Sequence, residues 1–339
     1  MHSFKKTGKP VLVLAVVLVI LYALDFALYP CTFTRNDVHA VTTNTYDDIY
    51  MGSSHGKMGI DPAVMESVSG RTGYNLCVGA EYCIDAYYLT KLILEKGHKP
   101  KRIVYDVAQG YFTSRKEEGN NYLLFYHEFP LSKAKIQYFW DAIRNCNFRT
   151  LLMPWYEYPL TYELEHMGET FSKKWHRDYG IEDLKSDTQI YHESGFVERY
   201  PVDTQELIDQ GVNGINTFSV ETVDPENMEY LRKLIALCKE EEIEFIAVIT
   251  PIPEISLAAY SESYSQAYMY FDQFFAENDV RCINFNSNQL FSLFTHDLAD
   301  YTDYNGHMNG ETAIQFSELL AKILDGELPE AAPVKEAAG

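Results

Sequence analysis

The strongest local signal in the chain is the stretch Asp47-Asp48-Ile49-Tyr50-Met51-Gly52-Ser53-Ser54-His55. An apolar centre followed by small residues is typical of a short buried strand that ends in a sharp turn. Beyond the turn, Asp61 before Pro62 predicts a helix start with Asp61 as its N-cap. A serine at a strand-to-helix turn lies at the carboxyl edge of a sheet, where open α/β folds bind ligands. Backbone N–H groups at such a turn point outward and can stabilise an oxyanion.

Strand and helix signals alternate along the rest of the chain. Apolar strand segments are found at 47–52, 73–78, 102–107, 243–250 and 280–285. Amphipathic helix segments are found at 81–96, 226–241, 256–277 and 310–324, and Gly97 is expected to end the first of them. This order predicts an α/β fold of three layers, with a doubly wound, flavodoxin-like parallel sheet between two layers of helices.

The boundaries of the domains follow from changes in composition. Residues 1–30 are expected to form a membrane anchor, and residues 46–325 a single α/β domain. Residues 110–225 interrupt the alternation and are rich in aromatic residues, so they are predicted to be an insertion with a helix at 132–144 that shapes the pocket. The aromatic cluster at 155–159 is interpreted as the core of this lid rather than as a sugar platform. The acidic, Ala- and Pro-rich tail at 326–339 is predicted to be disordered.

The N-terminus predicts the localisation. Lys5, Lys6 and Lys9 precede an apolar run at 10–29 whose only charge is Asp25. Basic residues before an apolar segment favour a cytoplasmic N-terminus, with the remaining chain outside the cytoplasm. No small-residue cleavage pattern follows the run, which favours an uncleaved single-pass anchor; a cleaved signal peptide is the alternative.

The composition excludes several classes of function. The net charge of −21 repels phosphate backbones, so nucleic acid is not an expected partner. The six cysteines form no CxxC pair, and His127-Glu128 and His192-Glu193 do not extend to HExxH. We therefore expect buried thiols, no metal and no cofactor. With 46% hydrophobic residues among 339, the chain can bury a large core without disulfides.

Five residues with acyl-transfer chemistry follow the predicted strands. Ser54 ends the first strand, Gly79 follows the second and Gln109 follows the third, whereas Asp303 and His307 lie between the fifth strand and the last helix. The carboxyl ends of the strands of a doubly wound sheet share one edge. We therefore expect these residues to meet there.

These blocks resemble those of the SGNH (GDSL-type) hydrolase family. The similarity extends to its membrane-anchored branch associated with acylation of cell-envelope polymers, which includes the teichoic-acid D-alanyl transfer protein. The family's Gly-Asp-Ser block appears as Gly52-Ser53-Ser54, and its second-block glycine maps to Gly79. Its Gly-x-Asn-Asp block is replaced by Asp-Val-Ala-Gln-Gly at 106–110.

The last block of the family departs in spacing. It is normally Asp-x-x-His, whereas three residues separate Asp303 from His307. Strict spacing would place Tyr304 at the acid position, and Asp300 is the alternative carboxylate.

The resemblance implies a role for each member of the constellation. Ser54 would be the nucleophile, His307 the base that takes its proton, and Asp303 the carboxylate that orients the imidazole. The backbone N–H groups of Ser54 and Gly79 would bind the oxyanion, with the Gln109 side chain as a third donor.

Neighbouring residues are assigned to the substrate or the turn. His55 is expected to orient the turn or to contact substrate, and Asn75 to contact substrate. Lys57 either attracts an anionic substrate or is simply solvated.

The expected function is that of a membrane-anchored, extracytoplasmic serine esterase or O-acyltransferase. Its substrate would be a cell-envelope glycan or an acylated polymer, and a polytopic membrane O-acyltransferase is a partner by analogy. The sequence leaves hydrolysis and transfer open. It also leaves two other hypotheses: a catalytically inactive SGNH-fold protein for envelope binding or assembly, and a signal-anchored peptidase.

Overall fold

The computed structural model describes residues 4–29, 31–79, 81–116, 123–146, 167–178, 184–287 and 289–327. The aromatic cluster at 155–159 and the tail from 328 lie outside these residues. The elements of the main domain that follow the chain order are α2 (Phe33–Thr43), β1 (Asp48–Gly52), α3 (Ser54–Gly59), α4 (Pro62–Ser69), β2 (Gly73–Asn75), α5 (Cys83–Glu95), β3 (Arg102–Asp106), α10 (Pro225–Glu240), β6 (Glu244–Ile249), α11 (Glu254–Ala259), α12 (Ser261–Glu277), β7 (Arg281–Asn284) and α13 (Gly310–Leu324).

The centre of the domain is a five-stranded parallel sheet in the order β2-β1-β3-β6-β7. In its register, Ile49 of β1 lies between Tyr74 of β2 and Ile103 of β3. The chain runs from β1 outward to β2 and then crosses back to β3 on the other side of β1. The carboxyl ends of β1 and β3 therefore form the topological switch point, where doubly wound folds open a crevice. The predicted three-layer α/β fold is confirmed.

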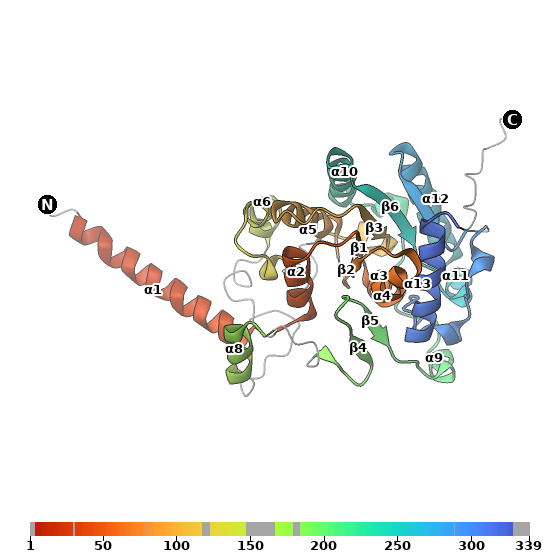
Figure 1. Ribbon diagram of the computed structural model, residues 1–339, viewed down its shortest axis with the longest axis horizontal. Helices are drawn as coiled ribbons and strands as arrows, with labels where there is room; N and C mark the ends of the chain where they lie inside the picture. Colours follow the sequence, from red (N-terminus) through yellow and green to blue (C-terminus); the bar gives the residue numbers. More distant parts are fainter. Residues whose placement is uncertain are drawn as a thin grey trace.

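Both faces of the sheet are covered by helices because its strands are apolar on both sides (Figure 1). Along β1, Ile49 and Met51 belong to one buried cluster, whereas Tyr50 between them belongs to the other. The first cluster includes residues of α5, α10 and α12; the second includes residues of α4 and α13, against which α3 also packs. Asp61 caps α4 by accepting from the Ala63 amide, and Pro62 occupies its first turn, as predicted.

Three elements differ from the sequence prediction. The strand expected at 73–78 ends at Asn75, although the amides of Leu76 and Val78 still donate to carbonyls of β1. The helix expected at 256–277 is divided at Tyr260, whose φ of −121° and ψ of 34° are not helical. Helix α3 begins directly at Ser54, where a sequence with two glycines in six residues had predicted only a turn.

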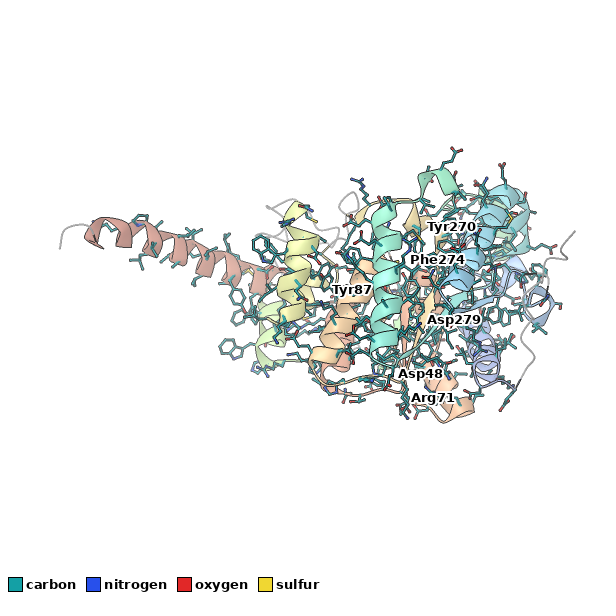
Figure 2. The ribbon with its side chains drawn as sticks, turned by 90° about the horizontal axis from the view of Figure 1, so that it is seen from above. Asp48, Arg71, Tyr87, Tyr270, Phe274 and Asp279 are labelled. Carbon is teal, nitrogen blue, oxygen red and sulfur yellow. The ribbon has the colours of Figure 1, made fainter. Side chains whose placement is uncertain are left out.

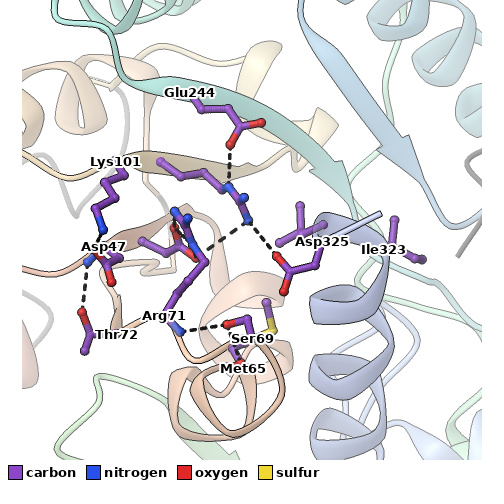
Figure 3. A network of polar contacts seen from close by, with 12 residues as sticks. Asp47, Met65, Ser69, Arg71, Thr72, Lys101, Glu244, Ile323 and Asp325 are labelled. Atoms are coloured by element: carbon purple, nitrogen blue, oxygen red, sulfur yellow. Dashed lines mark hydrogen bonds and ion pairs between the residues drawn. The ribbon is translucent and has the colours of Figure 1, made fainter. Parts of the chain in front are cut away.

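Charged residues connect the amino ends of the strands, opposite the switch point (Figure 3). Arg71 Nε lies 3.0 Å from both carboxylate oxygens of Asp48, and the two residues are adjacent in Figure 2. Arg102 of β3 bonds Glu244 of β6 at 2.7 Å and lies 4.0 Å from Asp325, which follows α13. This network joins β1, β3, β6 and the end of α13. It lies at the opposite edge of the sheet from the switch point.

The insertion contributes helices and a hairpin. Its described elements are α6 (Lys133–Asp141), α8 (Met167–His176), β4 (Gln189–Tyr191), β5 (Val197–Arg199) and α9 (Thr204–Gln210). The predicted helix at 132–144 is observed as α6, followed by a 3₁₀ turn at Ile143–Asn145. The turn of the hairpin reaches the edge of the sheet, where the Asn75 amide donates to Ser194 O at 2.9 Å.

Helix α1 (Phe4–Leu28) projects away from the body of the molecule in both views (Figures 1 and 2). Within the part of the chain that the structure describes, it is the single helix long and apolar enough to cross a membrane. Its apolar part is Gly8–Leu28, with a mean hydropathy of 2.9. Near its end, Asp25 lies 3.2 Å from His127 Nε2, so the one acidic residue of the run faces the protein.

Candidate active site

The nucleophile candidate lies at the turn that leaves β1. Gly52 has a φ of +126°, and a Cβ atom there would lie 2.3 Å from the Asp106 carbonyl oxygen. Only glycine tolerates both the dihedral angle and this close approach of β3. The tight turn places Ser54 at the first position of α3, directly at the switch point.

Three side chains from the two ends of the domain form a hydrogen-bonded chain. Ser54 Oγ lies 2.7 Å from His307 Nε2, and His307 Nδ1 lies 2.5 Å from Asp303 Oδ2. Burial alone would raise the pKa of Asp303, but the hydrogen bond to His307 and its charge outweigh burial and hold that pKa below its ordinary value. The carboxylate is therefore ionised at neutral pH and can fix the proton of the imidazole on Nδ1, which leaves Nε2 free to accept from Ser54.

The irregular Asp-to-His spacing is explained by the loop itself. Asp303 Oδ1 accepts from the amides of Asn305, Gly306 and His307, at 2.9, 3.2 and 3.3 Å. Because of these three hydrogen bonds, the loop curves around the Asp303 carboxylate, and the His307 ring comes back within hydrogen-bond distance of it. The alternative acid positions are engaged elsewhere: Asp300 Oδ2 accepts from Thr295 Oγ1 and Tyr304 OH donates to Leu207 O.

Two backbone amides near the nucleophile are the candidate donors to an oxyanion. A Cβ atom on Gly79 would lie 3.8 Å from Ser54 Cβ, so the Gly79 backbone adjoins the nucleophile. Gly79 is not among the glycines with positive φ, so its conformation does not itself require glycine. Among the described residues, the amides of Ser54 and Gly79 have no protein acceptor. Gln109 starts a 3₁₀ turn and is partly exposed, and no described hydrogen bond joins its side chain to Ser54.

Asp106, at the carboxyl end of β3, holds the turn that precedes α3. Asp106 Oδ2 accepts from the Ser53 hydroxyl at 2.6 Å and from the amides of Ser53 and Gly56 at 3.1 and 3.0 Å. This carboxylate thus holds the start of α3 in place. The sequence alone did not predict a role for Asp106, although an acidic residue at the carboxyl end of a buried strand was a visible signal.

His55 packs against the candidate base instead of lining open space. Its ring stacks on that of His307 with centroids 4.8 Å apart and an interplanar angle of 17°. Its Nε2 lies 2.8 Å from Asn305 O and its Nδ1 lies 3.0 Å from Ser53 Oγ. Burial, followed by the proximity of His307, lowers the pKa of His55, which favours its neutral form. Of the two roles expected for His55, these contacts fit orientation of the turn.

Asn75 and Lys57 differ from their expected roles. Asn75 is fully buried, and its amide donates to Gly56 O and Ile60 O while its oxygen accepts from the Cys77 amide. No polar group of this side chain is left for a substrate, so it braces α3. Lys57 is neither solvated nor exposed to a ligand, because it forms a buried ion pair with Asp37 at 2.9 Å.

A loop of the insertion, residues 211–218, passes beside the site; the insertion as a whole was expected to shape the pocket, but this loop was not singled out. Asn305 Nδ2 donates to Gly214 O at 2.7 Å. On the other side, a Cβ atom on Gly110 would lie 2.4 Å from Cβ of Asn216, so the loop also approaches the end of β3. It therefore connects the His307 loop with the region of Gln109. The sequence signal for it is a Gly- and Asn-rich stretch within 211–216.

Glu81 is a buried carboxyl group behind the turn, and its protonation gives a pH prediction. Its Oε2 accepts from the Gly52 amide at 3.0 Å, whereas its Oε1 has no partner among the described residues. Burial and then the charge of Asp85 raise the pKa of Glu81 well above its ordinary value. The folded state therefore keeps the proton where the unfolded state has lost it, and stability from this group must fall as pH rises above about 4.5.

We expect Glu81→Gln to remove this loss. The glutamine amide preserves the acceptor for Gly52 and does not ionise. The free energy of unfolding of the variant, relative to that of the native protein, should therefore increase with pH. The limiting slope is about 1.4 kcal/mol per pH unit for one proton. Urea unfolding of both proteins from pH 5 to pH 8 measures this difference; parallel curves would contradict a protonated Glu81.

The described residues contain no group of His, Cys, Asp and Glu that could hold a metal ion. His192, one of the two histidines weighed as ligands, lies 2.9 Å from Glu198, and His127 pairs with Asp25 at the end of α1. All six cysteines are free thiols.

Comparisons with known proteins are sparse. No protein-family model and no curated protein matches the sequence. Among 19 matching chains of solved structures is one provisionally described as a lipolytic protein of the G-D-S-L family from Desulfitobacterium hafniense DCB-2. It is 10% identical, with a TM-score of 0.38, and the match covers 82% of this chain and 99% of the other. The function of this chain is therefore inferred from its own site.

Proposed function

We propose that this chain is a membrane-anchored, extracytoplasmic serine esterase or O-acyltransferase that forms an acyl-enzyme on Ser54. The observation that supports this most directly is the chain of contacts from Ser54 Oγ through His307 to Asp303. A serine hydroxyl becomes nucleophilic when an aligned base takes its proton, and imidazole suits this task near neutral pH.

Each step of the proposed reaction has a group to perform it. His307 Nε2 takes the proton of Ser54 as Oγ attacks the ester carbonyl, and Asp303 stabilises the resulting imidazolium. The amides of Ser54 and Gly79 donate hydrogen bonds to the carbonyl oxygen as negative charge develops on it. The imidazolium then protonates the departing alcohol. In the second half, His307 deprotonates water or a glycan hydroxyl, which attacks the acyl carbon; the acyl bond to Ser54 breaks and the imidazolium returns its proton to Ser54 Oγ.

The place of action is part of the same proposal. Lys5, Lys6 and Lys9 before the apolar run favour a cytoplasmic N-terminus, which puts the α/β domain outside the cytoplasm. The proposed substrates are acyl esters of cell-envelope glycans or polymers. By analogy with the SGNH envelope-acylation branch, which the short sequence blocks resemble, a polytopic membrane O-acyltransferase would be the partner if the reaction is transfer.

The nucleophile can be tested with a fluorophosphonate probe on the full chain in detergent. We expect labelling of the native protein, loss of labelling in Ser54→Ala, and a labelled peptide that carries the probe on Ser54 instead of Ser53. Ser67→Ala is a suitable control because that exposed serine in α4 bonds only Val64 O. A folded native protein that resists the probe would refute the catalytic proposal and support an envelope-binding protein. If labelling is observed, acetyl-ester turnover with and without added glycan separates transfer from hydrolysis.

A further inference from the structure

Exposed apolar side chains gather at the end of the molecule from which α1 emerges. Outside α1, twelve large apolar side chains of the described residues are exposed, and six of them lie on or just before α6 and α8. These six are Leu131, Ile136, Trp140, Met167, Phe171 and Trp175. Both helices lie at the anchor end of the body in Figure 1. Scattered exposed apolar residues are normal, but a concentration on one side indicates an interaction surface.

Helix α8 continues the apolar surface of the anchor. Met167, Phe171 and Trp175 are four residues apart and share one face, with exposed fractions of 41%, 44% and 69%. Phe171 also packs edge-on against Phe26 of α1, with ring centroids 5.3 Å apart. The exposed stripe of α8 thus begins where the exposed surface of the anchor ends.

The position of α8 along α1 matches the expected surface of a bilayer. Gly8–Leu28 has 21 residues, about 31 Å of helix, which is close to the thickness of the hydrocarbon core. Lys174, on the buried side of α8, lies over the rings of Phe26 and Tyr29 at 5.5 and 5.4 Å. This contact fixes α8 beside the last turn of the anchor, which would lie at the level of the lipid headgroups if Gly8–Leu28 spans the bilayer.

Helix α6 supplies the second part of the surface. Ile136 and Trp140 are one turn apart and are 50% and 57% exposed, and Leu131 before the helix is 86% exposed. Exposed charges of both signs accompany these side chains: the bases Lys133, Arg144 and Arg177, and the acids Asp141, Glu169 and Asp178. Arg144 lies over the Trp140 ring at 5.9 Å, and tryptophan beside a basic residue is typical of the membrane interface.

We propose that α6 and α8 form a membrane-docking face that inserts its six apolar side chains into the bilayer leaflet from which α1 emerges. The α/β domain would then lie against the membrane surface instead of being attached to it through α1 alone. The inference rests on the anchoring part of the proposed function and is independent of the chemistry at Ser54. It implies that acyl acceptors are reached close to the membrane surface.

The test uses the full chain in nanodiscs that contain anionic lipid, with or without brominated acyl chains. The chain has three tryptophans, so replacing two of them by phenylalanine leaves Trp140 or Trp175 as the single probe. We expect brominated lipid to quench both probes. The matched control carries Met269→Trp with all three native tryptophans replaced, because Met269 on α12 is 64% exposed and away from the anchor end. This control should not be quenched.

Each outcome decides between docking and its alternatives. If Trp140 and Trp175 behave like the control at position 269, the face does not meet lipid and the docking proposal is wrong. Quenching of only one probe would overturn a face made of both helices. Extraction of the protein from membranes at alkaline pH would show separately that α1 is no anchor, and fluorophosphonate labelling would show whether the catalytic proposal stands.

Discussion

Asp303→Asn should slow acylation of Ser54 by about 10⁴-fold while the protein stays folded. The asparagine oxygen can still accept the three loop amides that Asp303 Oδ1 accepts, so the loop should persist. Its amide group, however, would donate to His307 Nδ1, where the carboxylate accepts. The imidazole would then carry its proton on Nε2 and could not take the proton of Ser54.

The rate of fluorophosphonate labelling, or of acetyl-ester hydrolysis, measures this effect. Asp300→Asn is the matched control, since Asp300 is the other nearby carboxylate and contacts Thr295 instead of His307. It should react at nearly the native rate. A slow Asp300 variant beside an unimpaired Asp303 variant would mean that the triad in solution uses the other acid.

The parts of the fold that were predictable are those with local patterns. The strands are short apolar runs buried on both faces, and Asp61-Pro62 is a helix start whose cap needs no distant partner. The expected place of the site then followed from the rule that doubly wound sheets gather their carboxyl ends at one edge. From that rule the proximity of Ser54 and His307, which are 253 positions apart in the sequence, could be predicted.

The unpredicted features depend on partners that no local pattern announces. Lys57 was read as a surface residue because its partner Asp37 lies on α2, a helix for which no sequence signal had been identified. Asn75 followed an apolar strand and looked free for substrate, yet α3 and its following turn use its whole amide. The approach of loop 211–218 to the site likewise arises from contacts with distant Asn305 and Gly110.

The buried pair of Lys57 and Asp37 connects the helix that begins at Ser54 to the helix that follows the anchor. Lys57 Nζ lies 2.9 Å from Asp37 and 3.1 Å from Asn75 O, and both charged side chains are almost fully buried. Tyr74 and Tyr191 also donate to Asp37, at 3.0 and 2.7 Å. Even so, burial raises the pKa of Asp37, so the carboxylate depends on the lysine for its charge.

Lys57→Met should therefore lower the free energy of unfolding by about 3–5 kcal/mol, because it leaves a buried carboxylate without its counter-charge. The loss should be larger at pH 8 than at pH 5: the folded state would hold the Asp37 proton, whereas the unfolded state releases it as pH rises above about 3.8. Adding Asp37→Asn should recover much of the stability, since the amide needs no cation. Urea unfolding of both variants measures these changes. Lys101→Met is the control, because Lys101 pairs with Asp47 but is 71% exposed. This control should change the free energy of unfolding by less than about 1 kcal/mol. If the single variant loses no more than that control, the pair does not hold α3 to α2, and the position of Ser54 must depend on Asp106 and Asn75 alone.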